Sequence, residues 1–292
     1  MPPPSIDWPR IVAAHPELQI QSIAFLGEGW TSHAFLVNES LVFRFPKRPE
    51  VWPELKREIA FLAATADLLP LAVPRYATVV RTSDAAAHGY AVYGRIPGRA
   101  LDLLGMSRDE RIAAAEGIAM FLQVLHGLHA CKSIRLHLPH GDECAGAMTL
   151  RRLAEQAVLP QLSTAEARRL LDQFDRYVGT EANFSFEPVV IHADLCADHI
   201  LVDRRLVSGI IDFSDVSLGD PDYDFASLSV DAGKEFVVEV AKRYGHPDLD
   251  LLLAKLQYFE VADHVDTIVN GEGWALPGQR ERAWHRLREC VS

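Results

Sequence analysis

The spacing of apolar residues changes once along this chain, and that change limits the folds available to it. Up to Pro97-Gly98, short apolar runs alternate with polar residues around turn residues, as in "IQSIAFLGEGWTSHAFLVNESLVFRFPK". This pattern predicts antiparallel strands joined by tight turns, one of them at Asn38-Glu39-Ser40. From about Ser107 the apolar residues recur at helical spacing. We therefore predict an α+β fold of two lobes, with a small antiparallel sheet and one helix in residues 1–97 and a mainly helical lobe in residues 98–292.

The helix of the first lobe is predicted from "PELKREIAFLAATADLL", which begins at Pro53, where the missing N–H of proline costs least. One face of this helix collects the apolar residues Leu55, Ile59, Leu62 and Ala66. In the second lobe, Ser163 and Glu166 form a capping-box pattern at the start of a helix. Helical spacing there covers residues 111–129, 163–178, 234–245, 249–269 and 279–290.

Charge and cysteine content narrow the class of protein. The net charge of −11 in 292 residues argues against a nucleic-acid partner, which would require a basic surface. The first ten residues lack the apolar core of a signal peptide, and no run reaches membrane-spanning length. We expect a cytoplasmic protein with no membrane partner and with reduced thiols, since no C-x-x-C pair joins Cys131, Cys144, Cys196 and Cys290.

The stretch "VVIHADLCADHILVDRRLVSGIIDF" carries the strongest functional signal. Its apolar runs predict three short buried strands at Val189–Ile191, Ile200–Val202 and Gly209–Ile211. His192-Ala193-Asp194-Leu195 with His199 mirrors the kinase catalytic loop H-R-D-L-x-x-x-N. Asp212-Phe213 then matches the metal-binding Asp-Phe pair of kinases, with Ser214 in place of glycine.

Phosphoryl transfer explains why two aspartates stand at these places. The reaction needs a carboxylate on the acceptor hydroxyl and Mg²⁺ on the phosphates, so we predict Asp194 as the base and Asp212 as the oxygen ligand of magnesium. His199 replaces the asparagine of kinases, and imidazole is a poor ligand for Mg²⁺. We expect His199 to bind the metal weakly or through water. His192 is expected to be structural, with its ring bonded to backbone near the Asp-Phe turn.

The segments "IHADLCADHILVD" and "GIIDFSDVSLGDPDYDFASL" resemble the aminoglycoside phosphotransferases, relatives of the protein kinases. Gly219-Asp220-Pro221 and Asp224 match the family's continuation, where we expect Asp220 and Asp224 to brace the catalytic loop or cap a helix. The aminoglycoside 2″-phosphotransferases look closest, and the macrolide phosphotransferases share the histidine at 199. The resemblance covers nearly the whole chain. It implies a protein-kinase-like fold, a nucleotide-binding first lobe, and a second lobe that carries catalysis and substrate binding.

The resemblance also implies the ligands. It points to ATP or GTP as phosphate donor, Mg²⁺ as cofactor and an antibiotic hydroxyl as acceptor, hence to resistance. The residues assigned to the nucleotide are Gly27, Gly29, Ser32, Arg44, Glu58, Tyr93, Gly94, Ile96 and Ile211.

Several of these assignments have an ordinary alternative. Gly27-Glu28-Gly29 would cover the phosphates, although a glycine pair in a hairpin can be just a turn. Arg44 would pair with Glu58 and hold phosphate oxygens, with Lys47 as a rival that strand parity places on the opposite face; the pair could also lie apart on the surface. Tyr93 falls at the gatekeeper position, where a bulky ring would favour guanine over adenine, or it packs between the lobes.

An acceptor with several amino groups would need a cleft of carboxylates. We assign Asp194, Asp231, Glu235, Asp263 and Asp266 to the acceptor, with Glu239 and Glu272 nearby in the sequence and Trp274 as a possible flank. Most charged residues on helices merely face solvent, which is the alternative for each of these.

One further group of residues suggests a metal and is set aside. The histidines and cysteines between residues 126 and 144 crowd together but follow no zinc-binding spacing: His126, His129, Cys131, His137, His140 and Cys144. A histidine near the end of a helix is also favoured by the helix dipole.

Two other functions stay open at this point. The chain could phosphorylate another small molecule, such as a macrolide, choline, homoserine or a sugar; a macrolide site would be broad and apolar. It could also be a pseudokinase that binds nucleotide and serves as an interaction module. Both aspartates argue against a pseudokinase, whereas His199 and the incomplete glycine motif leave it possible.

Overall fold

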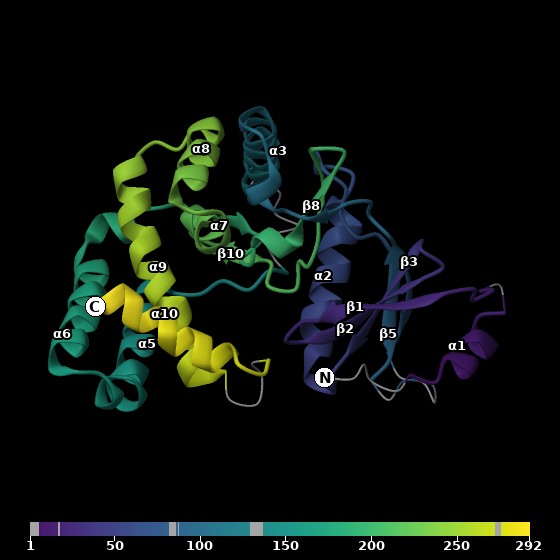
Figure 1. Ribbon diagram of the computed structural model, residues 1–292, viewed down its shortest axis with the longest axis horizontal. Helices are drawn as coiled ribbons and strands as arrows, with labels where there is room; N and C mark the ends of the chain where they lie inside the picture. The colour runs from purple at the N-terminus through teal and green to yellow at the C-terminus, as the bar shows by residue number, and fades with distance from the viewer. Residues whose placement is uncertain (1–5, 17, 82–85, 87, 129–136, 272–275) are drawn as a thin grey trace.

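The computed structural model describes residues 6–16, 18–81, 86, 88–128, 137–271 and 276–292. Figure 1 shows strands β1–β5 with helices α1 and α2 as one lobe, and a mainly helical assembly as the other. The predicted α+β fold with two lobes is confirmed. No helix among the described residues is both long enough and apolar enough to cross a membrane.

The first lobe contains a five-stranded sheet with the order β1-β2-β3-β5-β4, in which every neighbouring pair is antiparallel. Its strands are β1 (Ile23–Glu28), β2 (Ser32–Val37), β3 (Leu41–Pro46), β4 (Tyr76–Val80) and β5 (Tyr90–Gly94). Asn38 and Glu39 both have positive φ, 52° and 56°, which is the backbone of a type I′ turn between β2 and β3. The predicted tight turn is therefore confirmed at this place.

Strand alternation decides which side chains of β3 meet which helix. Phe43 and Phe45 point to the face covered by α1 (Trp8–Ala14), where the ring of Trp8 meets theirs edge-on at 5.6 and 5.7 Å. Arg44 lies between them in sequence and so points to the other face, toward α2 (Trp52–Thr65). The alternation of side chains along β3 thus places the guanidinium of Arg44 on the side of the sheet that faces α2.

Helix α2 presents the apolar face predicted from its sequence. Leu55, Leu62 and Ala66 are buried, and Ile59 is partly buried against the small cluster of Trp52, Leu55 and Ala91. Glu58 lies on this inward side and is fully buried, which a carboxylate tolerates only with a strong partner.

The second lobe is built from helices around one large apolar core. The helices are α3 (Arg108–Gly127), α5 (Glu143–Ala157), α6 (Thr164–Gly179), α7 (Asp224–Ala232), α8 (Lys234–Tyr244), α9 (Leu249–Asn270) and α10 (Gln279–Val291). The predicted capping box forms at α6, where the Ser163 hydroxyl accepts the N–H of Glu166 and the Glu166 carboxylate accepts the N–H of Ser163.

The strands predicted in residues 189–213 do not form one sheet. Strand β7 (Val189–Ile191) pairs with β10 (Ser217–Gly219), while β8 (Ile200–Asp203) pairs with β9 (Leu206–Ile210) and β6 (Arg99–Ala100). The third strand was predicted at Gly209–Ile211 and instead begins at Leu206. It starts earlier because Arg204 and Arg205, with φ of 48° and 74°, make a tight turn that lets pairing begin at once.

We propose Pro97-Gly98 as the boundary between the lobes. The five-stranded sheet ends with Gly94 in β5, whereas β6 already belongs to the sheet of the second lobe through its pairing with β8.

Candidate active site

The loop after β7 carries Asp194 and is held by a buried carboxylate. Ala193 has a φ of 66°, a left-handed conformation that costs a non-glycine residue energy. Asp224, at the start of α7, accepts the backbone N–H groups of His192 at 2.9 Å and Ala193 at 2.8 Å. His126 lies 3.1 Å from the same carboxylate, which is fully buried. The predicted brace of the catalytic loop is confirmed for Asp224.

Asp220 has the capping role that the sequence also allowed. Its carboxylate accepts the N–H of Asp222 at 3.0 Å in the short helix Pro221–Tyr223. Lys255 donates to both carboxylates, at 2.7 Å to Asp220 and 2.8 Å to Asp222. This network ties the segment that precedes α7 to α9.

The ring of His192 joins the two aspartate segments. Its Nε2 lies 3.1 Å from the carbonyl oxygen of Ile211, and its Nδ1 accepts the N–H of Asp194 at 3.3 Å. Complete burial lowers the pKa of His192 to about 4, so the ring is neutral and can donate with one nitrogen while it accepts with the other. The predicted structural role beside the Asp-Phe turn is confirmed.

Arg44 connects the first lobe to Asp212. Its guanidinium donates to both oxygens of Glu58 at 3.0 and 2.9 Å and to Oδ1 of Asp212 at 3.0 Å. Burial alone would raise the pKa of Asp212, but Arg44 and then His199 outweigh it and hold that pKa well below its usual value. Tyr76, which the sequence reading missed, completes the network by donating to Glu58 at 2.9 Å.

Lys47 does not compete for this place. Its ammonium pairs with Glu28 at 3.3 Å, away from Glu58, as expected from its position three residues after Arg44. The predicted contact between Arg44 and Glu58 therefore exists, and their role in nucleotide binding stays a prediction.

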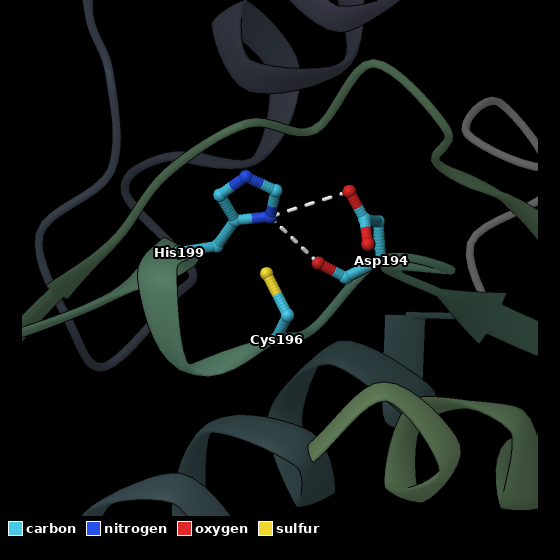
Figure 2. A group of neighbouring side chains, drawn as sticks. All are labelled: Asp194, Cys196 and His199. Carbon is cyan, nitrogen blue, oxygen red and sulfur yellow. Dashed lines mark hydrogen bonds and ion pairs between the residues drawn. The ribbon is translucent and has the colours of Figure 1, made fainter. Parts of the chain in front are cut away.

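His199 lies between Asp194 and Asp212, and Figure 2 shows its side chain beside that of Asp194. Its Nδ1 lies 2.8 Å from the backbone oxygen and 3.4 Å from Oδ2 of Asp194, as the dashed lines show, while its Nε2 lies 3.7 Å from Oδ2 of Asp212. Burial would lower the pKa of His199, but the adjacent Cys196 and the two carboxylates raise it to about 10. The two aspartates that stand eighteen positions apart in sequence thus face one imidazole.

Asp194 itself stands in acidic surroundings. Its carboxylate is 43% exposed, so an acceptor can reach it. Desolvation raises the pKa of Asp194 to about 7, and the negative charges of Asp215, Asp212 and Asp263 add to this against the opposing effect of His199. A carboxylate whose proton affinity is raised toward neutrality suits proton transfer near neutral pH.

Not all of the residues assigned to the acceptor lie in one group. Asp263 and Asp266 on α9 interact electrostatically, as do Asp263 and Asp231. Asp231, at the end of α7, also accepts the N–H of Ala197 at 3.0 Å and so supports the catalytic loop. Glu235 is exposed in the first turn of α8, and within the described residues no interaction joins it to the other four.

Two residues that the sequence reading missed stand beside this group. The negative charge of Asp215 contributes to the raised pKa of Asp194, and burial followed by the charges of Asp263, Asp194, Asp266 and Asp215 raises the pKa of Tyr223. The repeat of aspartate in "DFSD" was the available signal for Asp215. No sequence signal pointed to Tyr223, because its position depends on how α9 packs against the segment that precedes α7.

The turn at Gly27–Gly29 is held by a backbone hydrogen bond within the hairpin. The N–H of Gly29 donates to the carbonyl oxygen of Ser32 at 3.0 Å, and the Ser32 side chain is buried. Neither Gly27 nor Gly29 has an atom within 4 Å of the place where a Cβ would stand, so the space over the turn is open. Contact of this turn with phosphate stays a prediction.

The residues assigned to the nucleobase lie at the end of β5 (Tyr90–Gly94) and directly after it. Tyr93 and Ile96 are buried and Gly94 is exposed, while Ile211 is half-buried and accepts from His192. The ring of Tyr93 meets that of Tyr76 edge-on at 5.3 Å, beside the Arg44 network. Tyr93 therefore packs against a residue of its own lobe, and its gatekeeper role stays a prediction.

The histidine-rich stretch forms no metal-ligand group within the described residues. His126 belongs to the brace at Asp224, and His140 lies 3.2 Å from the carbonyl oxygen of Leu218. His129, Cys131, Glu272 and Trp274 lie outside the described residues. Cys144, Cys196 and Cys290 are free thiols, as predicted.

Comparisons with known proteins agree with this geometry. The GDP complex of wild-type aminoglycoside 2′-phosphotransferase-IIIa is 29% identical, with a TM-score of 0.89 and 96% of each chain covered. The GDP and kanamycin complex of APH(2")-IIia is also 29% identical, with a TM-score of 0.88 and 96% of each chain covered. Macrolide 2′-phosphotransferase type I is 20% identical, with a TM-score of 0.71 over 97% of this chain and 99% of that chain, and so shares the fold.

A family model described as the phosphotransferase enzyme family matches residues 22–259. This match spans the Arg44–Glu58 pair, the catalytic loop and the segment after Asp212, which are the parts that phosphoryl transfer requires. With the predicted resemblance thereby confirmed, the chain belongs to the phosphotransferase enzyme family and is an enzyme that transfers phosphoryl groups to hydroxyl groups.

Proposed function

We propose that this phosphotransferase passes the γ-phosphate of ATP or GTP to a hydroxyl group of an aminoglycoside in the cytoplasm and so confers resistance. The observation that carries this proposal is the acidic surroundings of Asp194, where burial first, and then the charges of Asp215, Asp212 and Asp263, raise the pKa of its carboxyl group. An acceptor with several ammonium groups would compensate these carboxylates through charge-assisted hydrogen bonds. Relatives of 29% identity, one of them in complex with kanamycin, support the same acceptor class.

In this mechanism Asp194 orients the acceptor hydroxyl and takes its proton. The hydroxyl oxygen forms a bond to the γ-phosphorus, the bond from that phosphorus to the bridging oxygen breaks, and the nucleoside diphosphate leaves with the electron pair. Arg44, fixed by Glu58, would hold phosphate oxygens between the lobes.

The residues around Asp212 fit Mg²⁺. Asp212 is ionised, its Oδ1 is bonded to Arg44, and its Oδ2 faces His199 at 3.7 Å, which leaves a hard oxygen for the metal. Asp212 would hold Mg²⁺ with His199 beside it. When bound, the metal neutralises charge on the phosphates.

The direct test is a panel of aminoglycosides and macrolides incubated with ATP or GTP and Mg²⁺. We expect a phosphorylated aminoglycoside, detected by mass spectrometry and located by NMR, and no phosphorylated macrolide. Phosphorylation of macrolides alone would replace the proposed acceptor class. Nucleotide binding without any product, in wild type and Asp194→Ala alike, would indicate a pseudokinase.

The gatekeeper role of Tyr93 gives a separate expectation about the donor. Replacing Tyr93 with alanine should raise kcat/KM for ATP relative to GTP by about tenfold, because a large ring at the back of the site restricts the depth available to adenine. Tyr93→Phe keeps the ring and should leave the ratio unchanged. An unchanged ratio in Tyr93→Ala would remove the gatekeeper argument.

A further inference from the structure

Three possible metal ligands lie together outside the active site, where α10 packs against α9. Glu260 and His264 are one helical turn apart on α9, and Cys290 is near the end of α10. A carboxylate oxygen, an imidazole nitrogen and the thiol sulfur of these residues all lie within 4.8 Å of one another. Figure 1 shows α10, in yellow, next to α9.

His264 is suited to act as a ligand. It is only 7% exposed, and within the part of the chain that the structure describes its ring makes no hydrogen bond. Its Nδ1 lies 3.7 Å from Oδ2 of Asp263, so one nitrogen can keep its proton toward a carboxylate while the other binds a metal.

The other two residues supply an oxygen and a sulfur. Burial and the neighbouring Glu260 raise the pKa of the Cys290 thiol to about 11, so this thiol must release a proton to solvent when it binds a metal. Lys234 lies 3.6 Å from Oε2 of Glu260, which leaves Oε1 for the metal, and at 49% exposure its side chain can turn into solvent.

We propose that Glu260, His264 and Cys290 bind one Zn²⁺, with water as the fourth ligand, and that the ion fastens the C-terminal helix to α9. A set of oxygen, nitrogen and sulfur ligands suits zinc, whereas Mg²⁺ prefers oxygen alone. The site would reinforce an anchor that already exists, since Arg169 of α6 donates to the carbonyl oxygen of Val291 at 2.8 Å. None of the three ligands is assigned to the acceptor, although Asp263, which lies beside His264, is.

Calorimetric titration of the full chain with ZnCl₂ in excess Mg²⁺, after treatment with a chelator, tests the proposal. We expect one zinc per chain, with the affinity lowered at least tenfold in Cys290→Ser and in Glu260→Gln. Cys144→Ser, which removes a thiol elsewhere, should bind zinc like the wild type. In the Co²⁺-loaded protein, the near-ultraviolet charge-transfer band of a thiolate should appear in the wild type and disappear in Cys290→Ser.

Two results would overturn this site. Unchanged zinc affinity in a folded Cys290→Ser would remove Cys290 as a ligand; if that variant fails to fold, Glu260→Gln, at a partly exposed side chain, decides in the same way. Loss of binding in Cys196→Ser instead would place the ion at Asp194, Cys196 and His199, the second ligand group among the described residues. Since neither nucleotide nor acceptor is present, failure here says nothing against the proposed phosphotransfer.

Discussion

Replacing Asp194 with asparagine is expected to lower kcat by about 10²- to 10⁴-fold, the range associated with loss of a positioned general base. Asparagine keeps the shape of the side chain and the hydrogen bond from its backbone N–H to His192, so the loop should stay in place. The nucleotide dissociation constant should change little, because the residues proposed to hold the phosphates are others. Steady-state kinetics and calorimetric nucleotide titration separate the two quantities.

Asp198→Asn is the matched control for that variant. It removes one negative charge from the same loop, but its side chain is exposed. Its kcat should remain within about twofold of the wild type, as is usual for surface changes. Equal kcat in Asp194→Asn and Asp198→Asn would reject Asp194 as the base.

Replacing Asp224 with alanine is expected to lower the free energy of unfolding by about 3 kcal/mol. The change leaves the N–H groups of His192 and Ala193 without an acceptor, and each buried unsatisfied donor costs about 1–3 kcal/mol. His126 loses its carboxylate partner as well. Because Ala193 then has no partner to hold its left-handed backbone, kcat should fall together with stability. Urea unfolding monitored by circular dichroism measures the first effect.

The control for Asp224→Ala is Asp250→Ala. Both aspartates lie in the first turn of a helix, α7 and α9, but Asp250 is exposed. Loss of the favourable charge at a helix N-terminus costs about 0.3–1 kcal/mol, so this variant should be only slightly less stable. Similar losses in both variants would show that Asp224 acts as an ordinary first-turn charge and not as the brace of the catalytic loop.

Local features of the first lobe could be predicted from sequence because each depends on neighbouring residues. Alternation along residues 41–46 placed Arg44 on the face opposite Phe43 and Phe45, and helical spacing placed Glu58 on the inward side of α2. Asn38-Glu39 supplied the positive φ values that a tight turn requires. The contact between Arg44 and Glu58 follows once these two faces meet.

Features that depend on contacts between segments far apart in the chain could not be predicted as well from the sequence. The sequence predicted strands at 189–191 and 200–202 without their partners, and β7 pairs with β10 while β8 pairs with β9, because a short apolar run does not encode which edge it joins. The positions of the acceptor carboxylates could not be predicted for the same reason. Asp263 and Glu235 were assigned by residue type alone, and packing of α9 brings only Asp263 toward Asp194.

The sequence by itself determined the chemical parts of this enzyme: the two aspartates, His192 and His199 in the same segment, the cation of β3 and the α+β character of the chain. These depend on residue type and short-range periodicity, which are properties of a segment. Tertiary structure alone decided that Asp212 meets Arg44 and His199, that Asp224 holds the strained loop, and that the charge of Asp215 acts on Asp194. Those contacts join segments far apart in the chain, and their geometry is fixed only when the helices and sheets pack together and bury them.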